Sequence, residues 1–185
     1  MGKLLPQVTV KIVDPDEEGR GEIAIKGPMV MQGYYKNPEE TAKVFDSEGY
    51  LLTGDIGYLD NENYLYLTGR KKNLIVTEGG KNVYPEEIED YFQLYDEVEQ
   101  IMVKGFLLDE KMKTEGIEAF VYPSEDSSKG KTQEELQKRI EEIVDEVNRD
   151  LLPYQRINRV KVLGDAMEMT TTKKIKRFAV AGEEE

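Results

Sequence analysis

The sequence has 185 residues, of which 38% are hydrophobic and 34% charged, so it can bury a globular core. It contains neither cysteine nor histidine, which excludes disulfides, thiolate and imidazole metal ligands, cysteine nucleophiles and histidine acid–base catalysis. The net charge of −13 disfavours nucleic acid as a partner, and no apolar run or signal peptide indicates a transmembrane or secreted protein. We expect a cytoplasmic protein with no metal-ligating residues.

The N-terminal part of the chain, residues 1–71, is predicted to be mainly β-structure. Residues 8–13 and 22–26 alternate in polarity and are separated by a turn-rich stretch, which predicts two antiparallel strands. Asn37 before Pro38 is typical of a helix start, and residues 64–68 predict a further strand.

The C-terminal part has the pattern of a small α+β domain. Pro85 begins one helix, and Thr132 with Glu135 forms the capping box of a longer one whose apolar residues recur at helical spacing. Short strands are predicted around these helices at 74–76, 100–106, 117–122 and 159–163. The order predicts an antiparallel sheet with two main helices, and the change of character places a domain boundary near Lys72.

Three segments contain residues that could bind a ligand or take part in catalysis, and each also has a purely structural interpretation. In "GYLLTGDIGYL" a tight turn over Thr53, Gly54 and Asp55 could aim the carboxylate at a ribose diol. An aspartate that bonds its own backbone is the favoured interpretation of that motif alone.

The second segment, "TGRKKNLIVTEGGKN", combines basic residues with paired glycines. Arg70 suits phosphate or ribose oxygens, and Gly79 with Gly80 would let a ligand approach the backbone closely. A hairpin with a charged edge explains the same residues equally well.

The third segment, "MTTTKKIKRF", gathers basic residues in a strongly acidic chain. Its threonines and a mobile lysine ammonium could neutralise developing negative charge during a reaction. Taken alone, the stretch favours a solvated basic tail or a nuclear-import-like run.

In order along the chain, however, these segments resemble one family. "GEIAIKGPMVMQGYYKNPEET", "GYLLTGDIG", "LTGRKKNLIVTEGGKNVYPEEIE", "LLPYQRI" and "TTTKKIKR" are similar to the final third of the acyl-adenylate-forming (AMP-binding) superfamily. The resemblance covers residues 2–177, and the motifs "GRKKNLIVTEGGKNV" and "TTTKKIKR" are most similar to those of long-chain fatty acid–CoA ligases. It implies the β-rich end of a large domain, part of a small distorted barrel, over 1–71, and a mobile lid domain over 72–185.

The resemblance also implies a reaction and the residues that serve it. ATP, with Mg²⁺, and a fatty acid give acyl-AMP, and the thiol of CoA then gives the thioester. Asp55 matches the aspartate that binds the ribose hydroxyls, and Arg70 matches an arginine near the ribose and phosphate. Lys174 matches the lysine that reaches the carboxylate and the α-phosphate during adenylation.

The lid is expected to move between the two steps. Lys72 falls at the family's hinge position. Gly79, Gly80 and Lys81 match the loop that lines the pantetheine tunnel when the thioester forms.

Several parts of the family's active site are not found in the sequence. The Ser/Thr/Gly-rich phosphate loop, the adenine-binding segment and the acyl pocket have no counterpart, so we expect a fragment that is inactive without an N-terminal domain. The full enzyme is expected in the cytoplasm, or peripherally at a membrane. Two alternatives stay open: a ligase for another acid or for a carrier-protein acceptor, and a stand-alone module that binds a nucleotide or a partner without chemistry.

Overall fold

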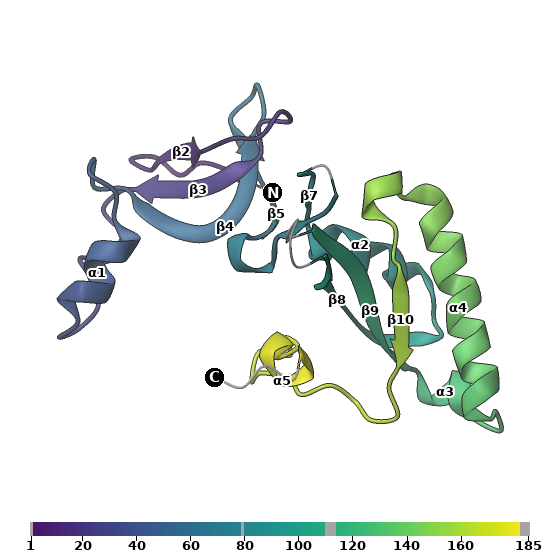
Figure 1. The fold of residues 1–185 in the computed structure, drawn as a ribbon. Helices are drawn as coiled ribbons and strands as arrows, with labels where there is room; N and C mark the ends of the chain where they lie inside the picture. The colour runs from purple at the N-terminus through teal and green to yellow at the C-terminus, as the bar shows by residue number, and fades with distance from the viewer. Residues whose placement is uncertain (1, 79, 110–113, 182–185) are drawn as a thin grey trace. The chain divides into compact units, whose positions relative to one another are not determined.

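The computed structural model describes residues 2–78, 80–109 and 114–181 (Figure 1). The chain divides into two compact units, Met1–Asn73 and Leu74–Glu185, which we call unit 1 and unit 2. The elements are β1 Gly2–Lys3, β2 Thr9–Val13, β3 Gly21–Lys26, α1 Pro38–Val44, β4 Leu51–Leu59, β5 Tyr64–Arg70, η1 Lys71–Asn73, β6 Ile75–Val76, β7 Asn82–Val83, α2 Pro85–Tyr91, η2 Phe92–Leu94, β8 Val98–Asp109, β9 Thr114–Pro123, α3 Glu125–Ser128, α4 Gln133–Asp150, η3 Pro153–Gln155, β10 Arg159–Val162 and α5 Arg177–Ala181.

Unit 1 is a five-stranded antiparallel sheet in the order β1-β5-β4-β3-β2. Among the described residues, its buried hydrophobic side chains are Ile23 and Ala24 on β3 and Ile56 on β4. The short helix α1 begins as predicted, because Asn37 Oδ1 accepts the amide of Glu40 at 3.1 Å and Pro38 follows. The β-rich prediction for this part of the chain is therefore correct.

The predicted tight turn at Thr53–Gly54–Asp55 is wrong, because β4 runs through it as a bulge. Leu52 pairs with Ala24 and Ile56 pairs with Glu22, so residues 53–55 lie opposite Ile23 alone. Gly54 has a φ of 71°, a backbone conformation that glycine adopts at little cost. The bulge bends β4 without ending it.

Unit 2 contains a three-stranded sheet in the order β10-β9-β8. β8 and β9 are antiparallel, as predicted, but β10 runs parallel to β9, so the sheet is mixed. The reason is the long helix α4 between β9 and β10, which returns the chain to the end of the sheet where β9 began. The α+β fold class is confirmed.

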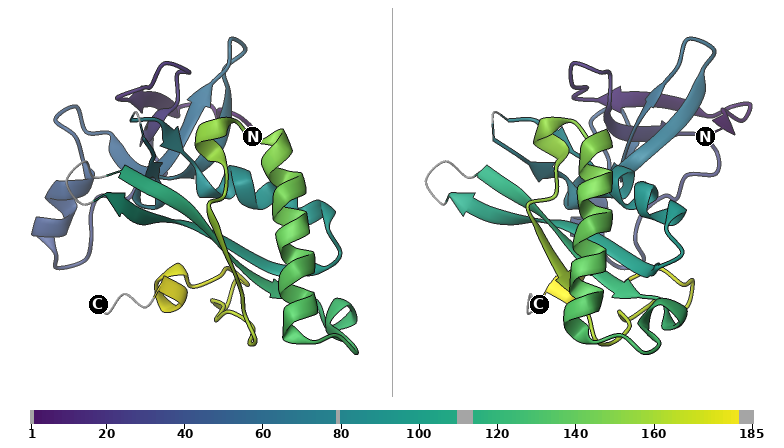
Figure 2. Two further views of the ribbon diagram at one scale, coloured as in Figure 1. Left: turned by 45° about the vertical axis from the view of Figure 1, so that its right-hand side comes forward. Right: turned by 90° about the vertical axis from the view of Figure 1, so that its right-hand side faces the viewer.

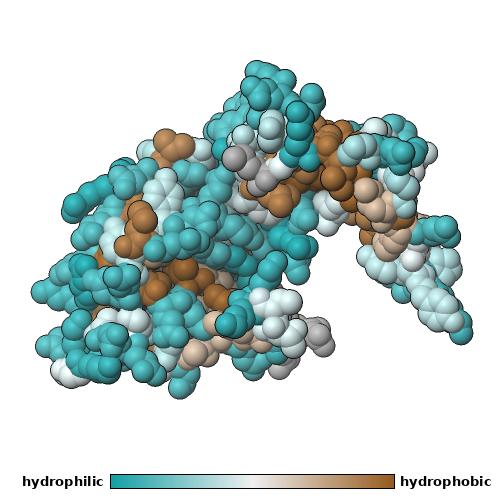
Figure 3. Space-filling model, turned by 180° about the vertical axis from the view of Figure 1, so that it is seen from behind, coloured by the Kyte–Doolittle hydropathy of each residue, from teal (hydrophilic) through white to brown (hydrophobic). Residues whose placement is uncertain are grey.

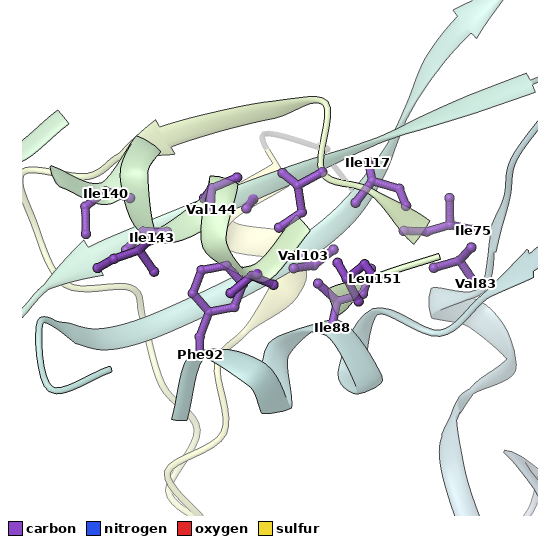
Figure 4. Close-up of a cluster of buried hydrophobic side chains, with 14 residues drawn as sticks. Ile75, Val83, Ile88, Phe92, Val103, Ile117, Ile140, Ile143, Val144 and Leu151 are labelled. Carbon is purple, nitrogen blue, oxygen red and sulfur yellow. The ribbon is translucent and has the colours of Figure 1, made fainter. Parts of the chain in front are cut away.

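The two main helices of unit 2, α2 and α4, cover one face of this sheet (Figure 2). Their apolar side chains meet those of the strands in the close-up of the core, where α2 contributes Ile88 and α4 contributes Ile140, Ile143 and Val144 (Figure 4). The capping box of α4 forms as predicted: Thr132 Oγ1 accepts the amide of Glu135 at 3.3 Å, and Glu135 Oε2 accepts that of Thr132 at 2.7 Å.

The segment after β10 packs on the opposite face of the sheet. Met102 and Phe120 alternate in sequence with the core residues Val103 and Ala119, so they point to the other side. There they form a second cluster with Met167, against which Leu163, Ile175 and Val180 pack. The basic segment is thus anchored by hydrophobic residues on both of its sides.

Both units expose large apolar side chains to solvent. Figure 3 shows hydrophobic residues over the sheet of unit 1, and the large exposed ones in this unit are Leu5, Met29, Tyr34, Tyr35 and Leu67. Within the described ranges, no helix combines the length and apolar character needed to cross a bilayer.

Candidate functional site

The structure brings Asp55 and Arg70 together on unit 1. They are direct cross-strand partners in β4 and β5, and Arg70 Nε lies 2.8 Å from Asp55 Oδ1. The side chain of Asp55 is 31% exposed and that of Arg70 is 52% exposed, so a ligand in solvent can reach both. The carboxylate can accept hydrogen bonds from two hydroxyls, and the guanidinium beside it can donate to an anion.

The bulge in β4 sets the position of Asp55 through side chains rather than ladder bonds. Thr53 Oγ1 donates to the carbonyl of Ile23 at 2.8 Å and accepts the amide of Asp55 at 3.1 Å. The amide of Gly54 donates to Glu22 Oε1 at 3.1 Å. The backbone amides of Gly54 and Asp55 are therefore both hydrogen-bonded to side chains.

Sequence reasoning missed Glu22, a residue whose total exposed fraction is only 7%. Its second carboxylate oxygen, Oε2, accepts from Lys71 Nζ at 2.7 Å. An acidic residue within an alternating strand predicts a solvent-facing position, so the sequence contains no signal for this burial.

Lys72, the predicted hinge residue, lies in the 3₁₀ turn η1 directly after β5 and is exposed. The turn includes Lys71 and ends at Asn73, where unit 1 ends. Its role as a hinge stays a prediction.

The glycine loop of unit 2 connects the short antiparallel strands β6 and β7. The amide of Gly80 donates to the carbonyl of Thr77, and the amide of Thr77 donates to the carbonyl of Lys81, both at 3.0 Å. Gly80 has a φ of 72°, and both it and Lys81 are exposed, whereas Gly79 lies outside the described residues. The loop is a closed turn whose backbone at Gly80 favours glycine.

The segment around Lys174 is a tight turn closed by an isolated bridge between Met169 and Ile175. The amide of Thr170 donates to the carbonyl of Lys174 at 2.7 Å, and the amide of Lys174 donates back to Thr170 Oγ1 at 3.1 Å. Lys173 is in the left-handed region with a φ of 59°. Lys174 is exposed in this turn, so its ammonium can be presented to a ligand.

Of the two basic residues that follow, Lys176 closes this turn on Glu168 and Arg177 connects it to α2 and β8. Lys176 Nζ lies 3.0 Å from Glu168 Oε2, and the amide of Lys176 donates to the carbonyl of Glu168 at 2.8 Å. Arg177 donates to both carboxylate oxygens of Glu89, at 2.8 and 2.7 Å. A solvated basic tail, the favoured interpretation of the motif alone, is therefore wrong for Lys176 and Arg177.

Arg177 and Glu89 together satisfy the backbone of Val103 on the edge strand β8. Arg177 Nη1 donates to the carbonyl of Val103 at 2.7 Å, and Glu89 Oε1 accepts its amide at 2.6 Å. Burial raises the pKa of the Glu89 carboxyl, while the charge of Arg177 and the Val103 amide lower it. We call these three residues the Arg177 clamp.

Comparison with solved structures identifies the fold. The chain has the fold of the C-terminal portion of adenylate-forming enzymes. The o-succinylbenzoate–CoA synthetase of Bacillus subtilis, solved with its acyl-adenylate intermediate, matches 97% of this chain with a TM-score of 0.77 and 30% identity. The adenylation domain of a carboxylate reductase from Mycobacterium chelonae matches 98% with a TM-score of 0.84 and 26% identity. The chain covers 34% and 30% of these two structures.

The sequence relatives are CoA ligases, and the chain spans about a fifth or less of their length. The long-chain-fatty-acid–CoA ligase of Bacillus subtilis is 44% identical over 101 residues, which are 55% of this chain and 17% of that enzyme. The 2-succinylbenzoate–CoA ligase of Listeria innocua is 45% identical over 104 residues, 56% of this chain and 21% of that enzyme. No family model matches the chain. The predicted resemblance is confirmed: the chain is related to one segment of the acyl- and aryl-CoA ligases of the adenylate-forming superfamily.

Proposed function

We propose that this chain is the C-terminal portion of an ATP-dependent fatty acyl-CoA ligase. In the first step the carboxylate of a fatty acid attacks the α-phosphate of ATP, giving acyl-AMP and pyrophosphate. In the second step the thiol of CoA attacks the acyl carbon, giving the thioester and AMP. The observation that carries the proposal is the exposed Lys174 in a turn fixed to unit 2, in a chain 44% identical to a long-chain-fatty-acid–CoA ligase over the matched residues.

In this proposal each candidate residue has a distinct task during adenylation. Asp55 accepts hydrogen bonds from the ribose hydroxyls, and Arg70 donates to the ribose and phosphate region. Lys174 places its ammonium between the carboxylate and the α-phosphate, where negative charge accumulates in the transition state. Among the described residues no cluster of acidic side chains could hold a metal ion, so Mg²⁺ is proposed to arrive with the ATP phosphates.

For the second step we propose that residues 72–185 move as a lid about Lys72. The turn with Lys174 leaves the acyl-AMP, and the glycine loop with Gly79, Gly80 and Lys81 lines the path of the CoA thiol. The phosphate loop, the adenine site and the acyl pocket belong to an N-terminal domain in this proposal. The chain alone is then inactive, and the full enzyme works in the cytoplasm or at the membrane periphery.

The test is a two-step assay of the enzyme that contains this chain. ATP-dependent pyrophosphate release is measured with palmitate and with 2-succinylbenzoate, and thioester formation is then measured after CoA is added. We expect both products with palmitate. Turnover with 2-succinylbenzoate alone would favour the second candidate, an aryl-acid ligase, which the 45% identity to the Listeria innocua enzyme supports. Nucleotide binding without pyrophosphate release from any acid would contradict the ligase proposal and favour a binding module.

Replacement of Asp55 by alanine should weaken ATP binding by about 1–3 kcal/mol, because two ribose hydroxyls lose their acceptor. The measurement is a titration of the intact enzyme with ATP. Glu62→Ala is the matched control, since Glu62 is an exposed acid in the turn between β4 and β5. Equal ATP affinity in the Asp55→Ala variant and the control would contradict the ribose assignment.

A further inference from the structure

Glu22 contacts the chain neighbours of both candidate nucleotide-binding residues. Its Oε1 accepts the amide of Gly54, which precedes Asp55, and its Oε2 accepts Lys71 Nζ, which follows Arg70. The two distances are 3.1 and 2.7 Å. One carboxylate on β3 therefore joins the bulge in β4 to the residue after β5, at one end of the Asp55–Arg70 pair.

The placement of this carboxylate is costly unless its oxygens are bonded. The Glu22 side chain is 9% exposed, and its neighbours along β3, Ile23 and Ala24, belong to the buried core of unit 1. A buried carboxylate loses hydration, and hydrogen bonds or a cation must replace it. Here both replacements come from groups that neighbour Asp55 and Arg70, and Lys71 remains 60% exposed at the surface.

We propose that Glu22 is a positioning residue for the nucleotide site, acting through Asp55 and Arg70. This inference rests on the proposed function, because it assumes that the Asp55–Arg70 pair binds the nucleotide. Glu22 fixes the bulge in β4 and the end of β5 so that the carboxylate of Asp55 and the guanidinium of Arg70 stay in one geometry before the ligand arrives. Pre-positioning of this kind improves binding because less order has to be imposed on association.

The bulge is the part of the site most sensitive to the loss of Glu22. The amide of Gly54 lies in an irregular stretch of β4, where β3 offers no regular ladder partner for residues 53–55. Without the Glu22 acceptor, the amide of Gly54 must bond to water or to another partner. The backbone between Gly54 and Asp55 can then shift. Thr53 would still hold the amide of Asp55, so the strand itself is expected to remain folded.

Two substitutions remove the ion pair of the carboxylate from its two ends and keep an acceptor for the amide of Gly54. Glu22→Gln keeps an oxygen that can accept from Gly54 but removes the charge that pairs with Lys71. Lys71→Met removes the same ion pair from its exposed end and leaves the buried core unchanged. In the intact enzyme we expect either variant to raise the dissociation constant for ATP roughly 10-fold, because small displacements of binding groups are expensive. Glu18→Gln is the control, since it neutralises an exposed acid that pairs with Arg20 in the loop between β2 and β3 and has no recorded contact with residues 53–55.

A double-mutant cycle distinguishes positioning from a general structural effect. If Glu22 acts through Asp55, Glu22→Gln should have little further effect on ATP affinity in an Asp55→Ala background. An undiminished 10-fold effect in that background, or unchanged ATP affinity in both single variants, would overturn the inference. Unchanged affinity in Asp55→Ala itself would instead overturn the proposed nucleotide site. Thermal unfolding midpoints of each variant identify any loss of affinity that comes from unfolding, and Lys71→Met then decides the outcome.

Discussion

Lys174→Ala should reduce acyl-AMP formation by about 10²–10³-fold in the enzyme that contains this chain, as expected when one charge-stabilising donor is removed from a reacting centre. Thioester formation from supplied acyl-AMP and CoA should continue at close to its normal rate. The reason for the difference is that the ammonium is required only while negative charge accumulates on the carboxylate and the α-phosphate. Pyrophosphate release measures the first step, and thioester formation from synthetic acyl-AMP measures the second.

Lys173→Asn is the matched control for this experiment. Lys173 occupies the left-handed position of the same turn, with a φ of 59°, and asparagine tolerates that conformation. The control therefore removes a neighbouring charge while it preserves the turn. Loss of both half-reactions in a folded Lys174→Ala variant would contradict the role that we assign to this lysine.

Arg177→Met should destabilise unit 2 by about 3 kcal/mol near neutral pH, at the lower end of the range for a broken buried ion pair because Arg177 is partly exposed. The variant leaves the Glu89 carboxylate with the Val103 amide as its remaining hydrogen-bond donor among those the structure records. Urea-dependent hydrogen exchange of the β8 and β9 amides in the 185-residue chain measures the free energy of opening of this unit directly.

The same variant should depend on pH in a defined direction. Burial already raises the pKa of Glu89 in the folded protein, and loss of the opposing arginine charge raises it further. A carboxyl whose folded pKa exceeds its unfolded pKa binds more protons in the folded state, so folding is favoured as the pH falls through the folded pKa. The stability deficit should therefore be smaller at about pH 5 than at about pH 8.

Glu89→Gln in the Arg177→Met background provides the control. A neutral amide removes the buried charge but keeps an oxygen for the Val103 amide, so part of the lost stability should return at neutral pH. A deficit that is equal at both pH values and is not relieved by the second substitution would exclude the uncompensated Glu89 carboxylate as its cause.

Features fixed by neighbouring residues could be predicted from the sequence. Pro85 and the pair of Thr132 and Glu135 define the starts of α2 and α4, because capping involves residues within one helical turn. The alternation of β2 and β3 also predicted their pairing correctly. The identity of the superfamily followed from several short motifs in a fixed order.

Features that depend on distant residues could not be predicted. The bulge at Gly54 arises from how β4 registers against β3, and the parallel direction of β10 arises from the path of α4. Arg177 and Glu89 are 88 positions apart, so nothing in the basic motif indicated that its arginine has a buried partner. The burial of Glu22 likewise depends on contacts with Gly54 and Lys71, which are more than thirty positions away.

The Arg177 clamp also has a consequence for self-association. β8 is an outer strand of its sheet, and an outer strand with open amides and carbonyls can recruit a strand from another molecule. At Val103 both backbone groups are already bound, the amide by a carboxylate and the carbonyl by a guanidinium. A second copy of the chain cannot extend the sheet across this point without first displacing Arg177, so the residue that fixes the Lys174 turn also blocks edge-to-edge aggregation at Val103.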